Sequence, residues 1–327
     1  MSSWITYRAS PSLALLKYWG KLDTGDNLPA TPSLAVTLGG LYTDTSVRVS
    51  TKDSLSIGGE LQEPGRFVAF FECLRSRLGV SKRFEARSTN SFPTAAGLAS
   101  SSSGFAALAG ACVQAAGREL PPEQLSQLAR SGSVSAARSV FGGFVLLPAG
   151  GRCAHQVFDE GHWPGLRIVV AVTHRGPKPV ASREAMRKTS LSSPFYRQWV
   201  TESAALLPEA LRALEARDLE KLGDLTRASY CMMHAAMLAA RPPIVYWLPA
   251  TLAVIQACQE LRRSGTGAWE TIDAGPQVKI LCRDSDVEAV VARVKESWPG
   301  IETLLCFPGA GVSISAGENP VSRDPVP

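Results

Sequence analysis

A long stretch without charge constrains this chain more than any other feature. No Asp, Glu, Lys or Arg lies between Ser88 and Gly117. That length would span a bilayer, which takes roughly 20 residues. Asn90, Pro93 and the run Ser100–Ser103 make the stretch too polar and too broken for a membrane helix. The pattern instead predicts a strand over Arg83–Thr89, a loop of small residues, and an Ala-rich helix over Ser101–Ala116.

The loop of small residues has the composition of an anion site. It reads Phe-Pro-Thr-Ala-Ala-Gly-Leu-Ala-Ser-Ser-Ser-Ser-Gly over residues 92–104. A helix N-terminus carries unpaired N–H groups and about half a positive charge, and small side chains allow a phosphate to approach the backbone. The sequence has no G-x-x-x-x-G-K-[ST] motif, so a phosphate-binding site in this loop would not be a Walker A P-loop. These residues alone fit equally well a Ser-capped helix that packs closely.

The composition is that of a folded globular protein. The chain has 327 residues, 45% of them hydrophobic, and 34 basic against 29 acidic residues give a net charge of only +5. Its length predicts about two domains, and its charge does not indicate nucleic-acid binding. Seven cysteines without any Cys-x-x-Cys indicate neither a disulfide framework nor a zinc site. The first ten residues lack the features of a signal peptide, so we expect a cytoplasmic protein without membrane insertion.

Strands and helices are mixed without regular alternation, which favours an α+β fold. The first half is expected to hold strands and two helices, the second of them the Ser101–Ala116 helix and the first at Phe67–Leu78, ended by Gly79. The other expected strands are 34–42, 45–50, 143–148, 167–173, 277–282 and 302–307, and the other expected helices are 206–217, 219–238, 245–263 and 287–298. A domain boundary is expected near Pro177–Pro179, giving domains at 1–177 and 178–316 and a mobile tail at 317–327.

Three further segments could carry chemistry. Arg138 follows Ser133 and Ser135 in a segment of small residues, and a guanidinium there could bind two oxygens of a carboxylate or phosphate. A solvated surface loop explains the same residues. Lys17 and Lys21 flank Tyr18 and could hold a phosphorylated ligand, although such clusters are common at ordinary edges.

Asp273 lies in Ile-Asp-Ala-Gly-Pro, directly before a predicted strand. A partly buried carboxylate there could act as a base, but an Asx-turn that stabilises the bend is the commoner explanation. The four histidines show no metal-ligand spacing and no arrangement typical of a catalytic triad.

Six segments together resemble one family. They are Leu-Leu-Lys-Tyr-Trp-Gly-Lys (15–21), the small-residue loop (93–104), Gly-Ser-Val-Ser-Ala-Ala-Arg-Ser-Val-Phe-Gly-Gly-Phe (132–144), Val-Ala-Ser-Arg-Glu-Ala-Met (180–186), Met-Met-His-Ala with Pro-Pro-Ile-Val-Tyr (232–246) and Ile-Asp-Ala-Gly-Pro (272–276). Their order and spacing are similar to those of the diphosphomevalonate decarboxylases of the GHMP kinase superfamily, from about residue 8 to 316.

The resemblance implies a two-domain GHMP kinase fold, with a ribosomal protein S5 domain 2-like N-terminal domain and a ferredoxin-like C-terminal domain. The active site would lie in the cleft between them. It also implies ATP-dependent conversion of mevalonate 5-diphosphate to isopentenyl diphosphate in isoprenoid biosynthesis, with CO2 and phosphate released, Mg2+ as cofactor, and a homodimer.

The resemblance also assigns residues to roles. Asp273 matches the catalytic aspartate, Arg138 the essential arginine, and Lys17 fits an electrostatic role beside them. The ATP phosphate loop would comprise Pro93, Thr94, Ala95, Ala96, Gly97, Leu98, Ala99, Ser100, Ser101 and Ser102. The substrate would contact Ser12, Tyr18, Lys21, Ser133, Ser135, Ser182, Arg183 and Met186.

Three positions depart from the family pattern. Ser12 replaces an Asn, Val134 a Gly and Ala137 a Cys. Val134 could narrow the loop, which leaves open a related activity on mevalonate 5-phosphate. A small-molecule kinase of the same superfamily and a non-catalytic nucleotide sensor would also fit the fold. Both are disfavoured because Asp273 and Arg138 occur together.

Overall fold

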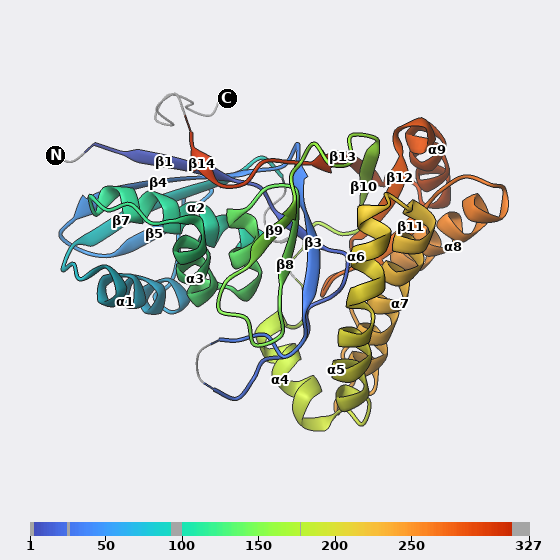
Figure 1. Cartoon of the computed structure of the whole chain (residues 1–327), viewed down its shortest axis with the longest axis horizontal. Helices are drawn as coiled ribbons and strands as arrows, with labels where there is room; N and C mark the ends of the chain where they lie inside the picture. The colour runs from blue at the N-terminus through green and yellow to red at the C-terminus, as the bar shows by residue number, and fades with distance from the viewer. Residues whose placement is uncertain (1–2, 25–26, 93–99, 177, 316–327) are drawn as a thin grey trace.

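The structure is a computed structural model that describes residues 3–24, 27–92, 100–176 and 178–315. Two β-sheets lie side by side, and each is covered by helices (Figure 1). The mixture of sheets and helices agrees with the predicted α+β class.

The first sheet has six strands in the order β14-β1-β4-β7-β5-β6. They are β1 (Ile5–Ala9), β4 (Thr43–Ser50), β5 (Ser54–Ile57), β6 (Glu60–Leu61), β7 (Arg83–Asn90) and β14 (Ser313–Ile314). The helices α1 (Arg66–Leu78), α2 (Ser100–Ala115) and α3 (Pro122–Gly132) lie on one side of it (Figure 1). The phenylalanines of α1 and the alanines of α2 form a buried core with Val47 and Phe84 of the sheet.

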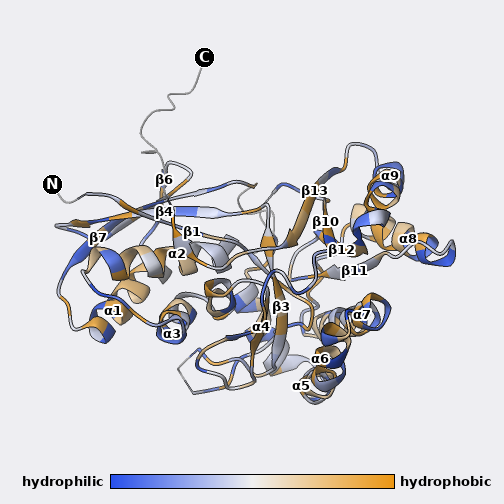
Figure 2. Ribbon diagram, turned by 45° about the horizontal axis from the view of Figure 1, so that its top comes forward, coloured by the Kyte–Doolittle hydropathy of each residue, from blue (hydrophilic) through white to orange (hydrophobic). Residues whose placement is uncertain are grey.

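The second sheet runs β11-β12-β10-β13-β3-β8-β9, with β2 paired to β3. Its strands are β2 (Ser12–Ala14), β3 (Ser33–Gly39), β8 (Phe144–Leu147), β9 (His155–Phe158), β10 (Leu166–Val172), β11 (Trp269–Ile272), β12 (Val278–Arg283) and β13 (Glu302–Pro308). β13 pairs with β10 along its length and with β3 at Phe307 and Pro308, so this sheet joins early and late parts of the chain. In Figure 2, β3 is mainly hydrophobic, consistent with its complete burial.

The remaining helices surround the late strands. They are α4 (Ser182–Ser192), α5 (Tyr196–Ala205), α6 (Leu207–Glu215), α7 (Leu219–Leu238), α8 (Pro249–Arg263) and α9 (Val287–Ser297). Two short 3-10 helices, η1 (Val134–Val140) and η2 (Asp284–Asp286), complete the regular structure of the described residues. α7 packs against β11 and thereby forms the support behind the residues that follow that strand.

The predicted helices are largely confirmed. Leu219–Leu238 has the expected bounds, and α1 ends at Gly79 in the left-handed conformation with φ 63°. The helix expected from Val245 begins only at Pro249, because Leu248 is extended and a proline disfavours helical backbone in the residue before it.

The expectation of only two helices in the first half is wrong, since α3 and η1 follow α2. The domain boundary near residues 177–179 stays a prediction. The predicted tail, residues 317–327, lies outside the described residues.

Candidate active site

Asp273 lies between β11 and β12 and is held by two lysines from different parts of the chain. Lys17 Nζ is 2.6 Å from Oδ1, and Lys279 Nζ is 3.0 Å from Oδ2. The two lysine side chains are almost completely buried, at 1% and 3% exposure, whereas that of Asp273 is 26% exposed. The carboxylate is therefore fixed by buried cations and still accessible to a ligand.

These charges shift the pKa values of both partners. Burial by itself raises the pKa of the Asp273 carboxyl, but the ammonium groups of Lys17 and Lys279 outweigh it and hold that pKa well below its usual range. Burial lowers the pKa of Lys17 to about 8, against the opposing attraction of Asp273. Asp273 is thus an anion at neutral pH and a weak proton acceptor.

Lys17 follows β2 and is positioned through its backbone and its side chain. Its backbone N–H donates to Ser229 Oγ on α7 at 2.9 Å, and its ammonium also donates to the Ala14 carbonyl at 2.8 Å. Two of the three ammonium donors therefore have fixed partners, the Ala14 carbonyl and Asp273. These hydrogen bonds orient the ammonium group of Lys17 toward the carboxylate of Asp273.

Arg138 lies in η1, and its guanidinium is buried at 3% exposure. Nε donates to Ser12 Oγ at 3.1 Å and an Nη donates to Ser33 Oγ at 2.6 Å. Burial lowers the pKa of Arg138 to about 10, while the charge of Asp273 acts in the opposite direction. Arg138 and Asp273 therefore influence each other electrostatically, although 135 positions separate them in the chain.

Ser12 connects this arginine to the serine-rich helix. Its backbone N–H lies 3.3 Å from Ser102 Oγ, in the first turn of α2. Ser102 is buried, Ser100 is half-buried and Ser101 is exposed. Of the predicted phosphate loop, residues 93–99 lie outside the described residues. Arg138 is thus joined through one serine to the start of α2.

A cavity of about 320 Å³ lies against the same helix start. Ser100, Ser101 and Gly104 of α2 line one side of it. Apolar and polar groups from the first sheet and its neighbours line the rest, among them Leu55, Ile57, Phe67, Gln62, Glu63 and Asn90. Its mixed lining suits a flat ring system with polar edges.

Tyr18 carries a buried hydroxyl for which the described residues provide no hydrogen-bond partner. Burial raises the pKa of this hydroxyl, against the opposing positive charges of Arg138, Arg183 and Arg130, so it remains a donor. A buried donor under the influence of positive charges is suited to an anion. Lys21 lies three residues further on, and its ammonium donates to Asn27 Oδ1.

Gly20 allows the Lys17–Lys21 segment to pass close to α5. Its φ is +107°, and a Cβ at this position would lie 2.0 Å from the Tyr196 hydroxyl oxygen. Trp199 Nε1 donates to the Trp19 carbonyl at 2.9 Å from the same helix. Packing on α5 therefore fixes the backbone between Tyr18 and Lys21.

Ser133 and Ser135 lie next to each other, with their hydroxyl oxygens 3.1 Å apart at the start of η1. Ser182 begins α4, and its hydroxyl accepts from Lys178 Nζ at 2.8 Å. Lys178 also donates to the carbonyl of Ala274 at 3.0 Å, which joins α4 to the residue after Asp273. Arg183 is exposed, and Met186 is buried against Trp19 and Met233.

Two of the three departures from the family pattern point into the core. Val134 and Ala137 are both buried, in a cluster with Val145, Leu147 and Ala154. The third, Ser12, accepts from Arg138 and so holds the guanidinium. The larger side chain of Val134 is accommodated by apolar packing beneath η1.

Sequence reasoning missed several residues that hold this site. Lys279, Ser229 and Ser33 contact Asp273, Lys17 and Arg138 respectively. The signal for Lys279 is a lysine inside the apolar strand Val-Lys-Ile-Leu-Cys, where only a buried partner explains the charge. Serines on a buried strand or helix face carry no comparable signal.

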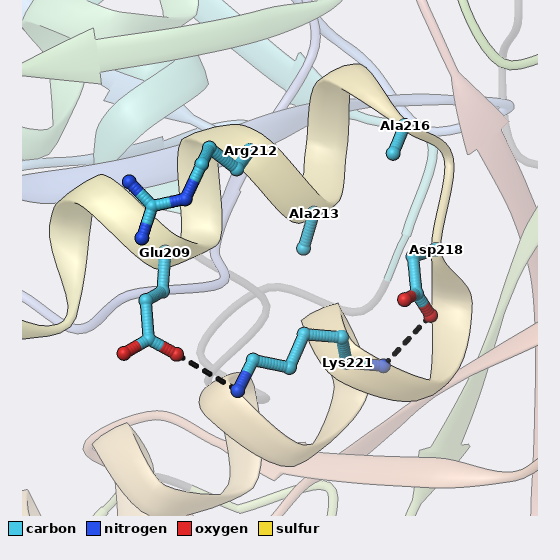
Figure 3. A pocket seen from close by; sticks show the side chains of 6 residues that line it. All are labelled: Glu209, Arg212, Ala213, Ala216, Asp218 and Lys221. Carbon is cyan, nitrogen blue, oxygen red and sulfur yellow. Dashed lines mark hydrogen bonds and ion pairs between the residues drawn. The ribbon is translucent and has the colours of Figure 1, made fainter.

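A second cavity, of about 290 Å³, lies on the outer surface between α6 and α7 (Figure 3). Its charged side chains contact one another. Lys221 Nζ is 2.8 Å from Glu209, and Asp218 accepts from the Lys221 backbone N–H at 3.0 Å. None of the residues around Asp273 described above lines it, and it provides no chemistry of its own.

Two family models match this chain. The diphosphomevalonate decarboxylase-like N-terminal domain matches residues 9–157, and the mevalonate 5-diphosphate decarboxylase C-terminal domain matches residues 168–315. Among curated relatives, diphosphomevalonate decarboxylase ERG19 of Gibberella zeae is 35% identical, over 92% of this chain and 87% of its own. The diphosphomevalonate decarboxylase of Homo sapiens is 34% identical, over 90% and 80%.

Solved structures agree over nearly the whole length. Mevalonate diphosphate decarboxylase from Staphylococcus aureus matches with a TM-score of 0.90 and 32% identity, over 96% of this chain and 98% of its own. The complex of MDDEF with MVAPP, AMPPCP and magnesium matches with a TM-score of 0.89 and 33% identity, over 96% and 99%. The predicted two-domain α+β fold is therefore confirmed.

Proposed function

The chain belongs to the diphosphomevalonate decarboxylase family of the GHMP kinase superfamily, and from that premise we propose that it is an ATP-dependent decarboxylase of mevalonate 5-diphosphate. The product is isopentenyl diphosphate, formed in the mevalonate route of isoprenoid biosynthesis. The observation that carries this proposal is the ion pair of Asp273 with Lys17, together with Arg138, on which the charge of Asp273 acts and which is joined through Ser12 to the start of α2.

In the first step, the oxygen of the substrate's tertiary hydroxyl forms a bond to the γ-phosphorus of ATP, the bond from that phosphorus to ADP breaks, and the hydroxyl proton leaves late in the transfer through Asp273 to solvent. Asp273 accepts a hydrogen bond from this hydroxyl and orients its oxygen for in-line attack. The low pKa of Asp273 makes it an orienting group rather than a strong base, which suits a loose transition state that needs little activation of the nucleophile. The ammonium group of Lys17 stabilises the negative charge on the phosphoryl group during its transfer.

In the second step, phosphate leaves the tertiary carbon and positive charge develops there. The bond to the carboxylate carbon then breaks, its electron pair forms the new double bond, and CO2 departs. Arg138 holds that carboxylate, and a guanidinium does so without removing a proton. Its hydrogen bonds to Ser12 and Ser33 fix the guanidinium plane beforehand.

The diphosphate end of the substrate needs several donors. Tyr18, with its unpartnered hydroxyl, would donate to it together with Lys21, Ser133 and Ser135. Arg183 and Ser182 would approach from α4, where Met186 packs beneath them. The relatives and structures named above all refer to the diphosphate, so the alternative substrate mevalonate 5-phosphate is not favoured.

The nucleotide would place its phosphates at the N-terminus of α2, which includes Ser100, Ser101 and Ser102, together with residues 93–99. The adjacent cavity of about 320 Å³ would take its base and ribose. In the described residues, no group of three or more His, Cys, Asp or Glu side chains is placed to hold a metal ion. This donor set fits an Mg2+ ion that would be held mainly by the phosphates of ATP, with hydroxyls such as that of Ser101 as further ligands. When bound, the ion would neutralise phosphate charge.

The test is a side-by-side turnover measurement with carboxyl-labelled mevalonate 5-diphosphate and mevalonate 5-phosphate. We expect release of labelled CO2 from the diphosphate only when ATP and Mg2+ are present. Asp273→Ala and Arg138→Ala should each abolish this release while leaving nucleotide binding intact. Faster turnover of the monophosphate would contradict the substrate assignment.

The protein would work in the cytoplasm as a homodimer. All seven cysteines are free thiols, which suits a reducing compartment. No described helix is both long and apolar enough to cross a membrane. Leu191, Phe195, Leu238 and Val245 expose apolar side chains near the ends of α4, α5 and α7, and a second copy would cover them. Sedimentation equilibrium distinguishes a dimer from a monomer.

A further inference from the structure

Lys279 is a charged residue in a position where a charge is costly. It lies on β12, a strand hydrogen-bonded on both sides, opposite Thr271 of β11 and Val170 of β10. Its neighbours Val278, Ile280, Leu281 and Cys282 are all fully buried, and Lys279 itself is 2% exposed. Burial of an ammonium group costs several kcal/mol unless a partner compensates it. The compensating carboxylate is that of Asp273, 3.0 Å away.

The two lysines on Asp273 are not equivalent. Lys17 comes from the part of the chain matched by the N-terminal family model and reaches Oδ1 from there. Lys279 lies six residues after Asp273 on the next strand and reaches Oδ2 from the same part of the fold. Lys279 therefore fixes the carboxylate relative to β11 and β12, independently of how the two parts of the chain approach each other.

Resting on the proposed function, we propose that Lys279 is a positioning residue of the decarboxylase, which holds Oδ2 of Asp273 so that the carboxylate stays ionised and turned toward the tertiary hydroxyl of the substrate. Lys17 is then available to balance phosphoryl charge during transfer. Positioning by Lys279 and charge stabilisation by Lys17 together explain why one carboxylate contacts two buried ammonium groups.

The charged and titratable groups that face Asp273 come from four elements. They are Lys17 after β2, Lys279 on β12, His234 on α7 and Arg138 on η1. Burial lowers the pKa of His234 to about 4, so it is neutral near pH 7. Lys279 is therefore one of two groups in direct ion-pair contact that keep Asp273 ionised in mildly acidic solution.

The test compares Lys279→Met with Lys279→Arg in the full chain, with labelled CO2 release from mevalonate 5-diphosphate as the readout. For Lys279→Met we expect kcat to fall by roughly tenfold to a hundredfold, because misplacement of a reacting group by about 1 Å costs up to 10²-fold. The KM for mevalonate 5-diphosphate should change much less.

Lys279→Arg keeps the cation and should restore most of the kcat that Lys279→Met loses. Lys295→Met, which removes an exposed lysine of α9, is the matched control and should behave like the wild type. Lys279→Met leaves the negative charge of Asp273 with one cation fewer, and the variant could therefore fold poorly. In that case Lys279→Met is tested in the Asp273→Asn background, where this negative charge is absent. There, adding Lys279→Met should reduce residual activity by less than about twofold, because coupled residues are not additive.

Failure of the proposed function and failure of the proposed role of Lys279 give different results. A wild-type protein that releases no CO2 from either phosphorylated mevalonate refutes the proposed function. An active wild type with a Lys279→Met variant of unchanged kcat overturns the role of Lys279 alone. Equal and additive losses in the wild-type and Asp273→Asn backgrounds also overturn it, since they indicate a purely structural effect.

Discussion

Lys17 Nζ lies 2.6 Å from Oδ1 of Asp273, although 256 positions separate the two residues in the chain. Lys17 is held in turn by Ser229 on α7, the helix that packs behind β11. The ion pair thus forms only when early and late segments are folded together. The pair of charges at the site is therefore complete only in the folded chain.

The first prediction concerns the pH dependence set by Lys17. Its pKa is about 8, lowered by burial, so the ammonium is charged below this pH and neutral above it. If the charged form is needed, kcat/KM should decline as the pH rises through about 8, since this ratio reports the free enzyme. Lys17→Arg, which stays charged, should remove this limb. A wild-type profile flat from pH 7 to 10 would contradict the role of Lys17.

The second prediction concerns the support of Arg138. Ser12→Ala removes the acceptor of Nε and leaves a buried charged donor unpaired, which costs about 1–3 kcal/mol. We expect CO2 release to fall in Ser12→Ala, but less than in Arg138→Lys, which also loses the contact with Ser33. Ser12→Asn, which restores the family residue, should retain most activity. Thermal unfolding measured in parallel separates stability from turnover.

The third prediction concerns Gly20. Gly20→Ala places a Cβ 2.0 Å from the Tyr196 hydroxyl at a backbone φ of +107°. Strain and overpacking together should lower the free energy of unfolding by about 1–3 kcal/mol. Gly165→Ala is the control, because no atom lies within 4 Å of its added Cβ. Chemical denaturation measures both variants, and equal stability of the two would be the contrary result.

The fourth prediction concerns His234 of α7, which is buried and whose ring packs against Tyr230 and Trp247. Burial lowers its pKa from 6.5 to about 4, so the unfolded chain binds a proton that the folded protein excludes. The neutral histidine therefore destabilises the fold progressively as the pH falls from 6.5 to 4, by about 3 kcal/mol in total.

The matched variant for that effect is His234→Gln, which does not titrate. At pH 7 it should be less stable than the wild type, because the ring contacts with Tyr230 and Trp247 are lost. The deficit should shrink as the pH falls toward 4. A deficit that stays constant across this range would mean that His234 is not the titrating group.

Much of the fold could be predicted because its helices carry strong local signals. Leu219–Leu238 repeats apolar residues at helical spacing, and Gly79 marks the end of α1. The short strands β1, β2, β5, β6, β9, β11 and β14 were missed, because two to five residues carry too little periodicity. The helices α3, α4 and α5 were missed because polar residues dominate their local composition.

Asp273, Arg138 and Lys17 could be predicted because their segments resemble one family, and residue type alone did not identify them. Asp273 in a turn was ambiguous until the structure brought Lys17 and Lys279 to it. The pairings of Arg138 with Ser12 and Ser33 join residues 126 and 105 positions apart, and no local pattern indicates such contacts. Their assigned roles with substrate stay predictions.

The most direct test of the central claim is the stoichiometry of one reaction. ADP, inorganic phosphate and CO2 should be measured together during turnover of mevalonate 5-diphosphate with ATP and Mg2+. The account predicts that the three products appear in equal amounts and that none forms with Asp273→Asn above a residual rate. Formation of ADP together with a stable phosphorylated acid, and without CO2, would show a kinase and contradict the account.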